Sequence, residues 1–193
     1  MENYEKETIA AIATALSDSG IGIVRISGEN AIYIVDSIFR SASGKKILTK
    51  VQSHMIHYGY IVDKDENIID EVMTSVMKAP KSYTMEDTVE INCHGGVLVM
   101  QKVLETVLQA GARLAEPGEF TKRSFLNGRI DLSRAEAVID VIHSQNEYAL
   151  SSSVSQLKGR LSDKIRSLRE DILYQIAFIE SALDLSLIHI SEP

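Results

Sequence analysis

Apolar and polar residues alternate with two different periods along this chain. In the N-terminal part, short segments alternate every second residue, as Thr88–Cys93 does, and this is typical of half-buried strands. Clusters of Gly, Ser, Asp and Asn separate these segments and indicate turns. Strands are therefore predicted over residues 8–14, 21–27, 54–62, 68–78, 88–93 and 112–115.

A helical period appears between the strands and then dominates the C-terminal part. Helices are predicted from about residue 28 through Ile38, over 97–110, and from Glu119 to Asn127. Ser133 and Glu136 fit a capping box for a further helix that runs to about residue 147. A second long run then repeats apolar residues at spacings of three and four, which indicates a seam for packing on another helix. The seam residues are Val154, Leu157, Leu161, Ile165, Leu168, Ile172, Ile176, Ile179 and Leu183.

These elements predict an α+β fold, in which an antiparallel-rich sheet with packed helices is followed by a helical arm. The 193 residues are 45% hydrophobic, which suffices for one core and an appended helical piece. The domain boundary is expected within 118–130. Residues 1–120 would form the N-terminal domain, and residues 121–184 the first part of a helical domain.

Charge and cysteine content predict a soluble, cytoplasmic protein. The net charge of −7 gives no general basic face for binding nucleic acid unaided. A single cysteine, Cys93, cannot form an internal disulfide. The N-terminus lacks a signal-peptide apolar region, and no run approaches the roughly 20 apolar residues of a membrane span.

Several motifs fail to indicate catalysis or metal binding. Ser43–Lys46 lacks the first Gly and the final Ser or Thr of a phosphate loop, positions that are Phe39 and Lys46 here. The five histidines form no metal constellation. Cys93 and His94 are adjacent rather than arranged as nucleophile and base. We therefore expect no catalytic residue and no metal ligand.

Three charged residues stand out instead. Arg25 lies between Val24 and Ile26, and Glu90 lies within the apolar alternation of its own predicted strand. Arg129 follows an Asn-Gly turn. Periodicity alone allows a simple interpretation, solvent-facing strand positions with an Arg25–Glu90 ion pair, because an alternating strand always has a polar face.

Four stretches taken together resemble the N-terminal region of the tRNA modification GTPase family MnmE, also called TrmE. They are Thr8–Thr14 with Gly20–Gly28 (TIAAIAT…GIGIVRISG), Pro80–Gly96 (PKSYTMEDTVEINCHGG), Ala112–Ala137 (ARLAEPGEFTKRSFLNGRIDLSRAEA) and Leu157–Asp184 (LKGRLSDKIRSLREDILYQIAFIESALD). The third stretch is the most specific. The resemblance covers nearly everything from Thr8 to Asp184.

The resemblance implies a function and a site. The family's N-terminal domain is similar to the folate-binding fold of aminomethyltransferases, forms a homodimer and binds a tetrahydrofolate derivative of the 5-formyl or methylene type. A Ras-like domain inserted into the helical domain uses GTP, potassium and magnesium. With the flavoprotein MnmG, the enzyme adds a carboxymethylaminomethyl-type group to the wobble uridine of certain tRNAs. The folate contacts match Arg25, Glu90 and Arg129.

The sequence departs from the family in three places. Ala15–Ser19 replaces a frequent Pro-Pro-Gly-Arg-Gly, and Arg129 replaces a frequent lysine, which keeps the charge but changes its geometry. The GTPase domain is not within these residues, so we expect no GTP hydrolysis by the fragment. Residues 185–193 resemble the translation of a sequencing-library adaptor, and we interpret them as a non-native tail.

Two other functions remain open at this stage. A stand-alone folate-dependent aminomethyl or formyl transferase would be expected to continue into a further β-rich domain, whereas the helical seam favours a helical partner domain. A purely structural dimerisation module is the other possibility, and ligand binding by the isolated domain would separate it from the first two.

Overall fold

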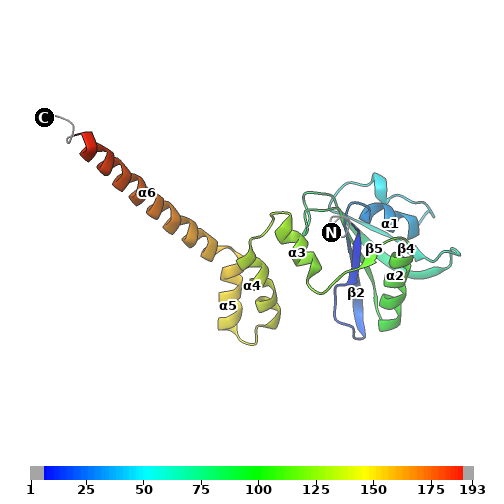
Figure 1. Cartoon of the computed structure of the whole chain (residues 1–193). Coiled ribbons are helices and arrows are strands. Elements are labelled where there is room, and N and C mark those ends of the chain that lie inside the picture. Colours follow the sequence, from blue (N-terminus) through cyan, green and yellow to red (C-terminus); the bar gives the residue numbers. More distant parts are fainter. Residues whose placement is uncertain (1–6, 189–193) are drawn as a thin grey trace. The chain divides into compact units, whose positions relative to one another are not determined.

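The computed structural model describes the backbone of residues 7–188 and the side chains of residues 7–183. The chain divides into two compact units between Arg129 and Ile130 (Figure 1). The sequence placed residues 121–129 in the helical domain instead. They belong to the first unit because Arg123 and Asn127 bond to that unit's backbone at Glu7 and Thr84.

The first unit contains a seven-stranded sheet with the strand order β3-β4-β5-β6-β2-β1-β7. Its neighbouring strands are antiparallel except for the parallel pair β1–β7. The predicted antiparallel-rich α+β fold is thus confirmed. The strands are β1 (Ile9–Ile12), β2 (Ser19–Ser27), β3 (Phe39–Ser41), β4 (Met55–Val62), β5 (Ile68–Met77), β6 (Thr88–Gly95) and β7 (Arg113–Leu114).

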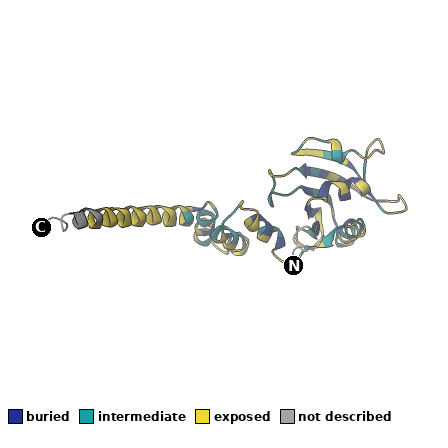
Figure 2. Cartoon of the chain, turned by 45° about the horizontal axis from the view of Figure 1, so that its top comes forward, coloured by how far each residue is buried: buried dark blue, intermediate teal, exposed yellow. Residues whose placement is uncertain are grey.

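The core lies between this sheet and the helices α1 (Ala31–Ile38) and α2 (Val97–Gln109). Alternation along β2 and β6 turns Val24 and Ile91 to the helices, and both side chains are fully buried. Figure 2 shows the buried residues concentrated in this unit. The same alternation turns Arg25 and Glu90 to the opposite face, which α1 and α2 do not cover.

A third helix, α3 (Glu119–Leu126), ends the first unit. Asn127 caps it, and Gly128 takes the left-handed φ of 78° that follows many helix ends, so the predicted stop at Asn127-Gly128 is confirmed. The predicted loop 41–53 also contains one turn of 3-10 helix, Leu48–Lys50.

The second unit consists of α4 (Leu132–His143), α5 (Glu147–Leu157) and α6 (Arg160–Ile188). The predicted capping box was wrong. Asp131 is the N-cap of α4, and its carboxylate accepts hydrogen bonds from the Arg134 N–H and the Ser133 hydroxyl.

The long amphipathic run is also two helices rather than one. Gly159, at a φ of 88°, breaks it, and a Cβ there would lie 1.9 Å from the Arg134 guanidinium. The seam residues of α6, from Ile165 to Leu183, are each about half exposed, and Figure 2 shows this exposure along the helix. Residues 189–193 of the predicted tail lie outside the described residues. No helix within residues 7–188 is long and apolar enough to cross a membrane.

Candidate functional site

The sheet register brings Arg25 and Glu90 directly opposite each other on β2 and β6. Arg25 Nε and Nη2 each lie 2.7 Å from the same oxygen of Glu90, Oε1. The two side chains are 29% and 22% exposed, so the pair is accessible without being fully solvated. The ion pair foreseen in the simple interpretation of these residues is therefore present.

Two aromatic rings flank this ion pair. The Arg25 guanidinium carbon lies 5.7 Å from the ring centroids of both Tyr83 and Phe120. The guanidinium carbon of Arg129 lies 4.9 Å from the Tyr83 ring. At these distances a ring quadrupole attracts a cation. All three residues named from the sequence therefore belong to one cluster.

Sequence reasoning missed Tyr83 and Phe120. Tyr83 lies in the segment between β5 and β6, and Phe120 lies on α3, so neither follows from strand alternation. One signal could have indicated them. Aromatic residues are only 6% of the chain, yet these two fall within the second and third stretches that carry the family resemblance.

An apolar area adjoins the cluster on the open sheet face. The register aligns Ile56, Ser75, Glu90 and Arg25 in one row across four strands. The next row carries Tyr58 and Met73, which pair across β4 and β5. The apolar members Ile56, Tyr58 and Met73 are 64%, 53% and 44% exposed. Large exposed apolar side chains gathered on one face mark an interaction surface.

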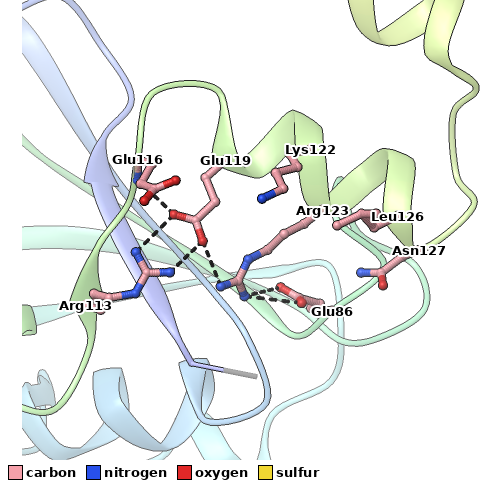
Figure 3. A pocket seen from close by; sticks show the side chains of 8 residues that line it. All are labelled: Glu86, Arg113, Glu116, Glu119, Lys122, Arg123, Leu126 and Asn127. Atoms are coloured by element: carbon pink, nitrogen blue, oxygen red, sulfur yellow. Dashed lines mark hydrogen bonds and ion pairs between the residues drawn. The ribbon is translucent and has the colours of Figure 1, made fainter. Parts of the chain in front are cut away.

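A partly buried network of charges lies at the base of α3, around a cavity of about 100 Å³ (Figure 3). Figure 3 shows the Glu119 carboxylate between the guanidinium groups of Arg113 and Arg123, with Glu86 on the far side of Arg123. Burial of Glu119 by itself raises the pKa of its carboxyl. Bonds from Arg113, the Glu116 N–H and Arg123 outweigh that effect and lower the pKa to about 2.

Cys93 and His94 each bond to a different partner, not to each other. Cys93 is buried, its thiol donates to the Gly22 carbonyl, and burial raises its pKa to about 11. The His94 ring instead contacts Asp70 at 2.7 Å, and that hydrogen bond raises the pKa of His94. Within the described part of the chain, no three His, Cys, Asp or Glu side chains form a group that could hold a metal ion.

Fold and site define a class: an α+β domain with an aromatic-flanked arginine–glutamate cluster on its open sheet face, joined to a helical unit. Two protein families match the two units. The family described as "GTP-binding protein TrmE N-terminus" matches residues 8–129, and the "MnmE helical domain" matches residues 132–191. The chain therefore belongs to the MnmE (TrmE) family, as its four stretches predicted.

Curated relatives agree with this assignment. The tRNA modification GTPase MnmE of Lachnoclostridium phytofermentans is 62% identical over 178 residues, which cover 92% of this chain. Those of Geobacillus kaustophilus and Carboxydothermus hydrogenoformans are 56% and 57% identical, each across 93% of the chain. The chain spans 39% of the length of each of these relatives. The helical-domain match extends to residue 191, so it includes most of the segment interpreted as a tail.

Proposed function

We propose that this chain is the folate-binding and dimerising part of a cytoplasmic tRNA modification GTPase. The complete protein would modify the wobble uridine of certain tRNAs together with the flavoprotein MnmG. GTP, potassium and magnesium would bind in the GTPase domain of the complete protein. The single observation that carries the ligand site is the Arg25–Glu90–Arg129 cluster around Tyr83.

The residues present fit a reduced folate. A pterin ring presents an exocyclic amine and a ring N–H side by side, and a carboxylate can accept from both. Both Arg25 contacts go to Oε1 of Glu90, and among the described residues Oε2 has no hydrogen-bond donor. The carboxylate therefore keeps acceptor capacity on the exposed side of the sheet.

Arg25 and Arg129 suit the other polar groups of such a ligand. A guanidinium binds a carboxylate with two parallel bonds, so either arginine can hold the glutamyl tail. Because Arg25 contacts Glu90 directly, it also orients the carboxylate. A bound tetrahydrofolate would supply a one-carbon unit, and the side chains of this chain would bind and orient it.

We propose that a second copy of the chain covers the apolar area formed by Ile56, Tyr58 and Met73. These residues lie on the same face of the sheet as Glu90. Met73 is on β5, which pairs with the strand of Glu90, and Ile56 and Tyr58 are on β4, one strand further away. A second copy there would exclude water from the ligand and provide apolar walls for a flat ring.

Calorimetric titration of a reduced folate into the unchanged chain and the Glu90→Gln variant tests the ligand site. Gln keeps the shape but replaces one acceptor with a donor that faces a ligand donor. Charge-assisted bonds contribute about 1.5–3 kcal/mol each, so affinity should fall about 10- to 100-fold or more. Glu105→Gln on α2, away from the open face, should bind like the unchanged chain. If the unchanged chain and Glu90→Gln bind the folate with equal affinity, Glu90 is only a solvent-facing strand residue.

A further inference from the structure

The segment between β5 and β6 carries Tyr83, and side chains of α3 and its C-cap hold it at three points. The Tyr83 hydroxyl lies 3.0 Å from the Thr121 hydroxyl. Asn127 Nδ2 donates to the Thr84 carbonyl at 2.7 Å. Arg123 Nη1 donates to both oxygens of Glu86, at 3.2 and 3.3 Å. The position of Tyr83 thus depends on α3, the helix that also carries Phe120.

Of the three residues of α3 and its C-cap that hold this segment, Arg123 is the most buried, with only 5% of the residue exposed. Its Nη2 donates to the Glu7 carbonyl at 2.8 Å and to Glu119 Oε1 at 3.1 Å. One guanidinium therefore joins the chain segment that leads into β1, the start of α3 and the segment that carries Tyr83. Lysine could not reproduce this, because it has no planar fork of donors.

The Arg123 network also reaches the strand that carries Arg25. Glu86 Oε2 accepts from the Ser27 hydroxyl at 2.8 Å, and Ser27 is two residues from Arg25 on the same face of β2. Glu86 is thereby fixed between β2 and α3. Tyr83 shares its segment with Glu86, and Phe120 shares α3 with Arg123; both ring centroids lie 5.7 Å from the Arg25 guanidinium carbon.

We infer that Arg123 is a positioning residue of the ligand site, which sets Tyr83 and Phe120 against Arg25 and thereby fixes the arginine that orients Glu90. The inference rests on the proposed folate site. Arg123 acts through its bonds to Glu86, Glu119 and the Glu7 carbonyl, and none of its hydrogen bonds goes to Arg25 or Glu90.

Loss of Arg123 should loosen this arrangement without dissolving the fold. Three sets of bonds do not involve Arg123 and should persist in its variants. The Ser27 and Thr84 hydroxyls lie 2.6 Å apart, the Gly28 N–H donates to the Asp87 carbonyl, and Arg113 donates to Glu119. A guanidinium–ring contact contributes about 0.5–2 kcal/mol, so misplacing the rings should weaken binding about 3- to 30-fold.

Calorimetric titration of a reduced folate into the full chain tests this. Arg123→Gln should bind about tenfold more weakly than the unchanged chain, and Arg123→Lys should restore little of the loss. Asn127→Ala removes a second bond to the same segment from a more exposed position and should weaken binding about threefold. The control is Asp36→Ala, which removes the buried acceptor of the Leu48 N–H on the helix-covered side. It should lose stability yet keep its affinity.

A double-mutant cycle separates positioning from general stability. In a Tyr83→Leu background, where the ring is already gone, Arg123→Gln should change affinity by less than about twofold. The same tenfold loss with and without the Tyr83 ring would overturn the inference. Unchanged affinity of Arg123→Gln, or an equal loss of affinity in Asp36→Ala, would overturn it too. No saturable binding by the unchanged chain would overturn the proposed function, and the inference with it.

Discussion

Glu119→Gln should remove a large part of the acid sensitivity of the first unit. In the folded chain, the bonds from Arg113, Glu116 and Arg123 hold the Glu119 pKa at about 2, against an ordinary value of 4.5. Because the folded-state pKa is depressed, the stabilisation is fully present above pH 4.5. It is lost as the pH falls through 2.

The difference between 4.5 and about 2 corresponds to about 3 kcal/mol of unfolding free energy at neutral pH. Glu119 is only 8% exposed, so solvent screens this interaction little. Gln resembles the protonated form of Glu119, so this figure already includes the interactions that the carboxylate makes with the Arg113 and Arg123 guanidinium groups.

Urea unfolding followed by far-ultraviolet circular dichroism, between pH 7 and 2, measures this. The difference in unfolding free energy between the unchanged chain and Glu119→Gln should be largest at neutral pH and shrink below pH 4.5. Other acid-sensitive groups, such as Asp131 with its pKa of about 2, remain in both chains and cancel in the difference. Glu105→Gln, an exposed carboxylate on α2, should behave like the unchanged chain. A difference that stays constant from pH 7 to 2 would refute the reasoning.

Three further outcomes are expected. Tyr58→Asp should convert a dimer to a monomer in analytical ultracentrifugation, whereas Leu98→Asp, at an even more exposed apolar residue on α2, should not. A Tyr58→Asp variant that remains a dimer would count against the proposed interface. In nuclear magnetic resonance spectra, the His94 ring should titrate with a pKa above the ordinary value of 6.5, and in Asp70→Asn this pKa should return toward 6.5. The small stabilisation from the His94–Asp70 pair is fully present below pH 6.5 and is lost as the pH rises through the folded-state pKa. Because residues 1–193 contain no phosphate-loop motif, the purified chain should show no saturable GTP binding by equilibrium dialysis, and saturation would contradict this.

The strands other than β3, which was not predicted, and the faces of the sheet could be predicted because a strand's side chains alternate strictly. Knowing that Val89 and Ile91 are apolar is enough to turn Glu90 to the other face. Sheet order was not available from the same pattern. The pairing of β2 with β6, which sets Arg25 opposite Glu90, joins residues 65 positions apart.

Other features depended on contacts that no local pattern specifies. Tyr83 and Arg123 belong to the site because α3 packs beside the segment that follows β5. The N-cap of α4 was predicted at Ser133, but Asp131 takes that position, and it also accepts a hydrogen bond from Ser162 near the start of α6. The break at Gly159 lies within an uninterrupted apolar period, so periodicity alone predicted one helix there.

The crystal structure of this chain with a bound reduced folate would test the central claim most directly. The account predicts two ring donors of the ligand within about 3 Å of the Glu90 carboxylate, with the Arg129 or Arg25 guanidinium on another polar group of the ligand. A folate bound away from the open sheet face, with the Arg25–Glu90 pair undisturbed and no ligand atom in contact with Glu90, would contradict it.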